Sequence, residues 1–179
     1  CATISNLNFG TSNYSNTIDP NILKGWGVRP SDWDWGVEVQ QEVLPRVSVS
    51  LGFFHREFFG FTVTDNLAIA PEDYTKFNIT APQDPRLPDG GGYAVGPIYD
   101  LNVPSLFGVT RNYITYSDRY GDQYQKFNGI DLSFNARPRN GVTVQGGFSG
   151  GYATSDNCAV REKVPEIALL NPFCHVETS

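Results

Sequence analysis

The chain has 179 residues, enough for one domain with a hydrophobic core. Its 18 glycines and 12 prolines, the absence of methionine and an aromatic content of 13% favour strands and structured loops over helices. The net charge of −6 and the lack of a basic run argue against a nucleic-acid partner. No apolar run approaches the ~20 residues of a transmembrane helix, although a strand of a membrane β-barrel needs only ~9–11.

The first part of the chain, residues 1–31, is rich in Asn, Ser and Thr and predicts a loop. Asp19 and Pro20 are suited to cap and begin a short helical turn that runs to Leu23 and ends at Gly25. Regular strands are therefore expected only after residue 31.

The segment 32–61 alternates between apolar and polar residues and organises the chain. One parity carries Trp33, Trp35, Val37, Val39, Val43, Val47, Val49, Leu51 and Phe53. The other carries Asp34, Gly36, Glu38, Gln40, Glu42, Ser48, Ser50 and Gly52. Successive side chains of a strand point to opposite faces, so this pattern predicts strands with one apolar and one polar face. The short connection Leu44-Pro45-Arg46 joins them as an antiparallel hairpin.

The segment 127–153 repeats this arrangement. Ile130, Leu132, Phe134, Val142, Val144, Phe148 and Tyr152 alternate with Asp131, Ser133, Asn135, Thr143, Gln145, Gly147 and Ser149, around a turn at Pro138–Gly141. Two long hairpins with tight turns at one end and long connections at the other are typical of a membrane β-barrel. The predicted fold is all-β: antiparallel β-hairpins from a transmembrane-type β-barrel, with long structured loops and short helical turns.

Aromatic residues gather at the strand ends that lie far from the tight turns. Trp33, Trp35, Phe53, Phe148 and Tyr152 fall in this region. In a membrane protein such residues form an aromatic girdle, with the rings buried and the polar tips wet. The alternative interpretation is that these aromatic residues belong to the core of a soluble β-sandwich.

The two long connections, 62–124 and 154–179, are expected to be structured loops. In the first, 61–63 and 113–116 resemble strands, and Pro71 is suited to begin a helical turn. In the second, prolines at 165 and 172 predict one short helix between them.

The loop between Asp84 and Asp100 contains Asp84, Asp89 and Asp100, which could bind Ca²⁺ together with backbone carbonyls. Their spacing fits no EF-hand, and aspartate in a Pro/Gly-rich loop usually stabilises turns, so no cofactor is expected apart from this weak calcium possibility. Arg86 is predicted to form an ion pair that holds the loop.

Three cysteines are present. Cys158 and Cys174 lie in the same terminal segment and predict a disulfide in an exported protein. A metal site built from Cys158, Cys174 and His175 is the weaker alternative, because the sequence has no CxxC pair. Cys1 is expected to be unpaired or to link to another chain.

Several motifs resemble a known family. They are Gly25–Trp33, Gln41–Val49, Asp84–Pro88, Gly90–Tyr93, Asn128–Asp131, Asn157–Cys158, Pro165–Ile167 and Asn171–Glu177. Together they resemble the barrel portion of TonB-dependent-receptor-like outer-membrane proteins, of the acidobacterial-like type with an N-terminal carboxypeptidase-regulatory-like domain. The resemblance covers nearly the whole chain and implies an outer-membrane barrel with a plug domain and energy-coupled uptake.

The chain departs from that family in having no coupling box, no plug and no terminal strand ending in an aromatic residue. It is expected to supply only about four spanning strands and to stop within a loop. We therefore expect residues 1–179 to be a single segment of a larger β-barrel. The resemblance assigns no ligand-binding residue to any position of this sequence.

Two functions are considered. The first is a non-catalytic fragment of an outer-membrane TonB-dependent receptor or transporter, in contact with outer-membrane lipid and with the remainder of its own barrel. Glu38, Asp131, Asn135 and Arg137 would face the lumen. The alternative is a released structural fragment that pairs with copies of itself in an extracellular filament or tubule. The expected location is the outer membrane or the exterior of a Gram-negative bacterium.

An enzyme is not expected. His55 lies within a strand without a nucleophile motif nearby, and His175 follows a cysteine that is expected to be oxidised. The sequence contains no GxSxG, no HExxH and no phosphate-binding glycine loop.

Overall fold

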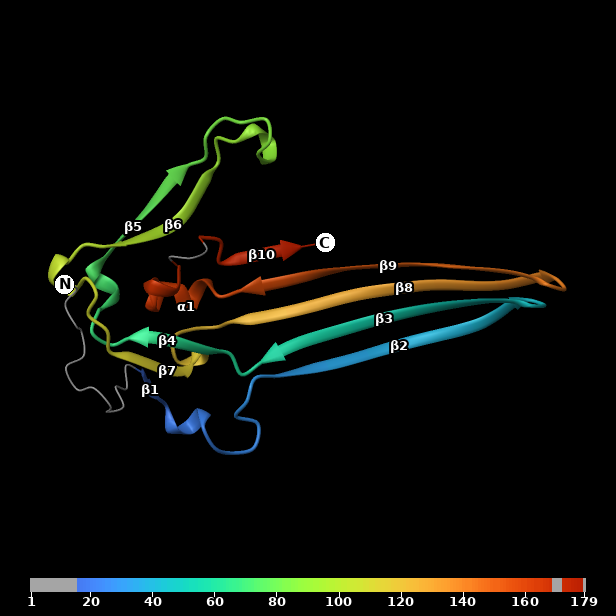
Figure 1. The fold of residues 1–179 in the computed structure, drawn as a ribbon, viewed down its shortest axis with the longest axis horizontal. Helices are drawn as coiled ribbons and strands as arrows, with labels where there is room; N and C mark the ends of the chain where they lie inside the picture. Colours follow the sequence, from blue (N-terminus) through green and yellow to red (C-terminus); the bar gives the residue numbers. More distant parts are fainter. Residues whose placement is uncertain (1–15, 169–171, 179) are drawn as a thin grey trace, which may run out of the picture.

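The structure is a computed structural model that describes residues 16–168 and 172–178. It is mostly antiparallel β-sheet, and two long hairpins project from a more irregular unit, which is built by the segment before the first hairpin and by the two connections (Figure 1). Within these described ranges, no helix combines the length and the apolar character needed to cross a membrane.

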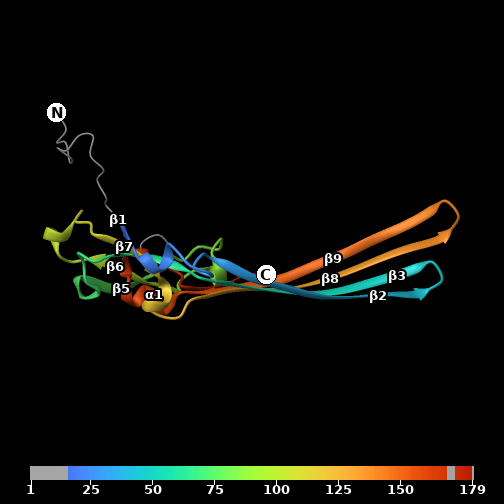
Figure 2. The ribbon, with the colours of Figure 1, turned by 90° about the horizontal axis from the view of Figure 1, so that it is seen from below.

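The main sheet has five strands in the order β10-β9-β8-β3-β2, and all neighbours are antiparallel. Its strands are β2 (Ser31–Leu44), β3 (Val47–Phe59), β8 (Tyr124–Arg139), β9 (Val142–Asp156) and the short β10 (His175–Thr178). Period-two alternation therefore predicts both hairpins correctly. Seen along its edge, the sheet of long strands is one thin layer that curves toward the turns (Figure 2).

The turns of the two hairpins lie side by side at the far end of the sheet (Figure 1). Arg46 takes a positive φ of 67°, and its N–H donates to Oε1 of Glu42 at 2.9 Å. Gly141 supplies the corresponding positive φ of 82° in the second turn, where the absence of a Cβ makes this conformation inexpensive. The N–H of Arg137 donates to the carbonyl oxygen of Arg46 at 2.9 Å, which joins the hairpins at their tips.

A small sheet forms the base of the hairpins. Its order is β1 (Asn16–Ile18), β7 (Asn112–Tyr116) and β4 (Thr62–Asn66); β1 is parallel to β7 and β4 is antiparallel to it. The helical turn predicted after Asp19 is a 3₁₀ turn at Pro20–Ile22, and the Asp19 carboxylate accepts the N–H of Asn21 at 2.9 Å.

The connection 62–124 is more regular than a long loop. Besides β4 and β7 it contains β5 (Tyr74–Thr80) and β6 (Ala94–Leu101), which pair as a separate arm. The 3₁₀ turn predicted to begin at Pro71 is present at Pro71–Asp73, and others lie at Pro88–Gly90, Pro104–Leu106 and Ser117–Arg119. The arm was not expected because a bulge at Gly96 and Pro97, opposite Asn78, interrupts its alternation.

The terminal connection also differs from the expected loop. Of the segment between the prolines at 165 and 172, where one short helix was predicted, the structure describes a 3₁₀ turn at Pro165–Ala168, and residues 169–171 lie outside the described ranges. The α-helix α1 comes earlier, at Cys158–Lys163. The Ala, Arg, Glu and Lys residues of α1 favour a helix.

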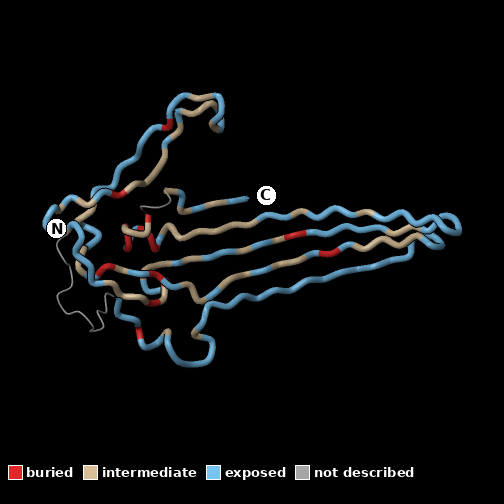
Figure 3. Tube along the Cα trace, viewed as in Figure 1, coloured by how far each residue is buried: buried red, intermediate tan, exposed pale blue. Residues whose placement is uncertain are grey.

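Burial is concentrated at the base of the hairpins (Figure 3). Val63 of β4, with Val160 and Val164 of the α1 segment, forms a buried cluster against which Tyr120 and Ile167 pack. β2 is exposed along its whole length and β8 and β9 over most of theirs, whereas β3 is mostly half-buried (Figure 3). The base therefore has its own small core, and the sheet of long strands does not.

Candidate functional site

The candidate functional surface is the two-faced sheet formed by β2, β3, β8 and β9. On one face, apolar residues of neighbouring strands stand directly opposite one another. One such row is Val39, Leu51, Leu132 and Phe148. Val39, Leu51 and Phe148 are 63%, 56% and 64% exposed. The described parts of the chain leave this apolar face uncovered, which is typical of an interaction surface.

The row nearer the base is aromatic and polar: Trp35, His55, Asn128 and Tyr152. The Trp35 ring lies 5.5 Å from the ring of His55 and 5.6 Å from that of Phe53, centroid to centroid. His55 Nδ1 and Asn128 Oδ1 are 2.8 Å apart. Apolar rings and polar tips thus occur together at this level.

The five residues predicted as an aromatic girdle all lie on this face. Trp35 and Tyr152 share one row, and Trp33 belongs to the next row toward the base. Phe53 stands in the row on the other side, opposite Ile130, and Phe148 lies one row further toward the turns. They form a staggered band and not a single line.

A charged pair marks the row of Trp33. Lys126 Nζ lies 2.8 Å from Oε1 of Glu57, its direct neighbour across β8 and β3. The same ammonium lies 5.7 Å from the centre of the Tyr124 ring. The apolar face therefore ends here. The sequence analysis did not predict this boundary. It could have been found from Glu57 and Lys126, two charged residues at alternation positions that are otherwise apolar.

The opposite face is polar and internally hydrogen-bonded. The hydroxyl of Ser50 donates to Glu38, and that of Ser149 donates to Asp131. Near the base, Arg56 pairs with Asp34 at 2.7 Å and with Asp32 at 3.1 Å. Each carboxylate among these thus has a donor on a neighbouring strand.

Glycines on the polar face accommodate phenylalanine rings. A Cβ added to Gly36 would lie 2.7 Å from Cδ1 of Phe54, and one added to Gly52 would lie 3.0 Å from its Cε2. Phe127 covers Gly129 and Gly151 in the same way, at 2.9 Å and 2.7 Å. The rings cover the sheet backbone at these glycines, where no side chain of the glycine itself could shield it from solvent.

Both edges of the sheet are open among the described residues. β2 pairs only with β3, so its outer edge presents unpaired backbone groups over Ser31–Leu44. On the other side, β10 pairs with β9 only between Ala153 and Asp156. Exposed edges of this length bind another strand readily.

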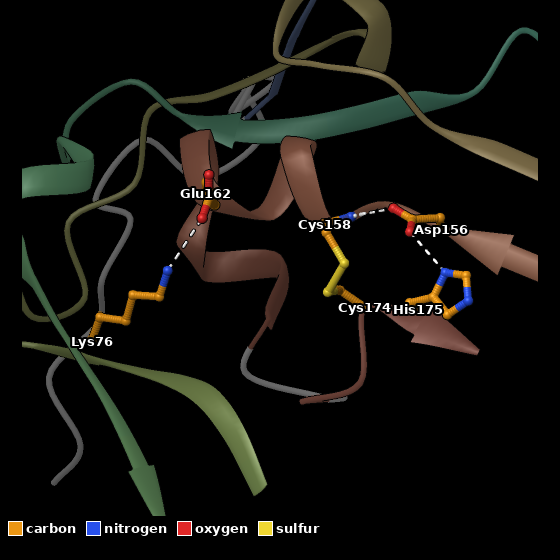
Figure 4. Close-up of a disulfide and its surroundings, with 6 residues drawn as sticks. All are labelled: Lys76, Asp156, Cys158, Glu162, Cys174 and His175. Atoms are coloured by element: carbon orange, nitrogen blue, oxygen red, sulfur yellow. Dashed lines mark hydrogen bonds and ion pairs between the residues drawn. A yellow bond between two sulfur atoms is a disulfide. The ribbon is translucent and has the colours of Figure 1, made fainter. Parts of the chain in front are cut away.

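The predicted disulfide between Cys158 and Cys174 is confirmed, with their Cα atoms 4.8 Å apart (Figure 4). Because both sulfur atoms form this bond, neither cysteine offers a free thiolate to a metal in this structure. The Asp156 carboxylate accepts the N–H of Cys158 at 3.0 Å and lies 2.8 Å from Nδ1 of His175. Cys1 lies outside the described residues.

A buried aspartate fastens the small sheet. Asp19 is 1% exposed, and its carboxylate lies 2.7 Å from Nη2 of Arg119 and accepts the hydroxyl of Thr115 at 2.6 Å. The Thr115 and Asn21 donors, assisted by the charge of Arg119, lower the pKa of Asp19. Sequence reasoning identified Asp19 only as a cap, because its other partners are distant in the chain.

A second polar cluster joins β4 to the terminal segment. Glu166 accepts the N–H of Asn66 at 2.7 Å, and Tyr120 donates its hydroxyl to Asp65 at 2.6 Å. Burial raises the pKa of Glu166, and burial together with Asp65 raises the pKa of Tyr120. Each group is held by a partner on another element, an arrangement suited to stabilising the base.

The three aspartates considered for calcium have other surroundings. Asp84 pairs with Arg86, with 2.6 Å between Oδ2 and Nη2, as predicted for that arginine. Asp89 lies in a turn at a φ of 51°, and Asp100 stands opposite Thr75 in the arm. Over residues 16–168 and 172–178, three or more potential metal ligands do not gather at any one place.

Comparisons of the chain with protein-family models, with curated proteins and with solved structures found no match. The functional argument is therefore made from the two-faced sheet, its boundaries and its open edges.

Proposed function

We propose that the chain forms part of the wall of an outer-membrane β-barrel of the TonB-dependent-receptor type in a Gram-negative bacterium, with a non-catalytic role in uptake. In this proposal, membrane lipid covers the apolar face and the polar face lines the lumen. The observation that carries it is the exposed apolar face of the long sheet, which the described chain leaves without any packing partner.

The dimensions of that face fit a membrane. From Trp33 to Val43, one parity of β2 carries apolar residues interrupted by Gln41. This distance is about ten residue steps, or ~33 Å along the strand at ~3.3 Å per residue. A tilt of ~45° reduces it to a height of ~23 Å, close to the ~25 Å apolar band of outer-membrane barrels.

The boundaries support the same proposal. Trp35 and Tyr152 lie where a girdle is expected, and the ion pair of Lys126 with Glu57 lies one row beyond, where the lipid headgroups begin. Barrels have short turns on the periplasmic side and long loops outside. The base with its Cys158–Cys174 disulfide would then face the oxidising exterior.

The open edges imply partners. In a barrel, the outer edges of β2 and β9 would pair with the neighbouring strands of the remaining wall, which satisfies every backbone group in lipid. The same edges also favour the second candidate function, self-assembly of copies into an extracellular filament or tubule. In that case, protein and not lipid would cover the apolar face.

The size of the native particle distinguishes these functions. We expect the purified chain to remain dispersed only in detergent or lipid when size-exclusion chromatography is combined with light scattering. A regular detergent-free polymer of intact chains, seen by negative-stain imaging, would support self-assembly instead. A detergent-free monomer would contradict both functions and favour a soluble sandwich.

Tryptophan fluorescence tests the lipid contact directly. Trp26 is fully exposed at the base, so its replacement by Phe leaves Trp33 and Trp35 as the reporters. In vesicles, we expect lipids brominated near the headgroup end of the acyl chain to quench these two most strongly. The matched control carries Trp33→Phe and Trp35→Phe, and its remaining Trp26 should stay unquenched. Equal or absent quenching in the two variants would contradict the proposed function.

A further inference from the structure

The turn end of the sheet carries a concentration of positive charge. Arg46 lies in the first turn, and Arg137 and Arg139 lie at the end of β8 beside the second turn. The backbone hydrogen bond between Arg137 and Arg46, at 2.9 Å, holds the two hairpin tips together. A second link joins Nη1 of Arg46 to Oδ1 of Asn140 at 3.5 Å. The three guanidinium groups therefore start from neighbouring backbone positions. Alternation predicted that Arg137 faces the lumen, but the register between β8 and β9 shifts between Ala136 and Arg139, so alternation does not fix the face of Arg137 at the turn.

These arginines are not neutralised within the described chain. Arg56, at the opposite end of the same sheet, pairs with two aspartates, whereas Arg46, Arg137 and Arg139 have no carboxylate within ion-pair distance among the described residues. Glu42, the nearest acidic residue in sequence to the first turn, accepts the backbone N–H of Arg46. The end of the sheet thus presents three exposed guanidinium groups beside one carboxylate, that of Glu42.

We propose that Arg46, Arg137 and Arg139 form a binding site for the phosphate of an anionic phospholipid headgroup. The inference rests on the proposed function, because it places these residues at the membrane surface on the turn side. Val43 and Val142, which end the apolar strand segments, lie within a few residues of the arginines. A phospholipid whose acyl chains lie against the apolar face would bring its phosphate to this level.

The chemistry of the side chains favours phosphate. A guanidinium group offers a planar pair of N–H donors that matches two phosphate oxygens, and it stays charged at any physiological pH. Its long stem lets the charge reach the interface from a backbone position at the edge of the hydrocarbon. Attraction to an anionic leaflet contributes about 1 kcal/mol per basic residue, which corresponds to about a fivefold change in partitioning.

The test compares binding of the chain to vesicles of phosphatidylcholine alone and of phosphatidylcholine mixed with phosphatidylglycerol. The tip variant carries Arg46→Gln, Arg137→Gln and Arg139→Gln. The control carries Lys24→Gln, Arg29→Gln and Lys163→Gln, which removes the same charge at the base. Binding is measured by co-sedimentation and insertion by quenching of Trp33 and Trp35.

We expect the unmodified chain and the control to prefer the anionic vesicles and the tip variant to lose about fivefold of that preference for each arginine replaced. All three should insert equally into phosphatidylcholine. Equal preference in the tip variant and the unmodified chain, or an equal loss in the control, would overturn this inference alone. Failure of the unmodified chain to insert into either vesicle would overturn the proposed function and the inference with it.

Inorganic phosphate without vesicles separates a lipid headgroup from free phosphate as the ligand. We expect calorimetric titration of the detergent-solubilised chain with inorganic phosphate to give no saturable binding, because the site needs headgroups held at the membrane surface. Saturable binding that the tip variant loses would assign the arginines to free phosphate and overturn the lipid assignment.

Discussion

His175 and Asp156 stand directly opposite each other in paired strands, and Nδ1 of the imidazole lies 2.8 Å from Oδ2 of the carboxylate. The hydrogen bond to Asp156, followed by the contribution of Glu177, raises the pKa of His175. The pair holds β10 against β9 just after the disulfide (Figure 4). The attachment of this strand is therefore sensitive to protonation.

The first prediction concerns the pH dependence of that attachment. Because the pKa of folded His175 is raised, its stabilisation is complete below the ordinary value of about 6.5 and is lost as the pH rises through the raised pKa. Amide exchange of Val176 should accelerate over this range, relative to the intrinsic rate. His175→Gln should remove the pH dependence, while His55→Gln should preserve it; the reverse result would contradict the role of the pair.

The second prediction concerns Asp19. Its lowered pKa means that its stabilisation is present above about 3.8 and disappears as the pH falls through the folded value. Asp19→Asn should lower the thermal stability of the base at pH 7 and flatten its acid dependence. Asp118→Asn, a change at an exposed aspartate, is the matched control and should do neither.

The third prediction concerns the disulfide. Its 16-residue separation corresponds to about 3 kcal/mol of stabilisation in the chain-entropy account. Cys158→Ser with Cys174→Ser should lower the free energy of unfolding of the base by about that amount in urea titration. Amide exchange should increase in α1 and β10 and stay unchanged at the hairpin turns. A uniform increase along β2 and β3 would instead mean that the disulfide stabilises the whole sheet.

The fourth prediction concerns Phe54 and the glycine beneath it. Gly36→Ala places a methyl group 2.7 Å from the Phe54 ring, so the ring must move, at a cost of about 1–3 kcal/mol. In a Phe54→Ala background the same change should be nearly neutral. A double-mutant cycle measured by chemical denaturation gives the coupling between the two positions. Additive effects would show that the ring does not cover Gly36.

The fifth prediction uses two neighbouring residues on opposite faces. Leu132→Arg should lower the stability of the membrane-inserted chain by about 2–4 kcal/mol, because it places a charge near the middle of the lipid-facing band. Ser133→Arg, on the polar face, should insert almost normally. Denaturation from vesicles gives both values. Equal effects of the two changes would contradict the assignment of the faces.

The hairpins could be predicted because their information is local. Alternation over 32–61 and 127–153 predicts the bounds of β2, β3, β8 and β9 to within a few residues. It also assigns each residue to the apolar or the polar face, because successive side chains point to opposite faces. The staggered position of the aromatic band required the register between β3 and β8, which no local pattern contains.

The base could not be predicted in the same way. Glu166 meets Asn66 across 100 positions, and Arg119 meets Asp19 only after β1 has joined β7. Such contacts depend on the completed topology. The arm β5–β6 is short and bulged, so its alternation is too brief to distinguish it from a loop.

The pairing of β4 with β7 has a consequence for the order of folding. β3 and β8 are separated by the connection 60–123, and their pairing must close it. Once Thr62 pairs with Tyr116, only about ten residues remain in that loop, which lowers the closure cost by ~2 kcal/mol. Each hairpin forms from residues that are close together in the chain. The pairing of β3 with β8, in contrast, becomes easier once β4 has paired with β7. A base that forms before the two hairpins join would therefore speed their pairing into one sheet.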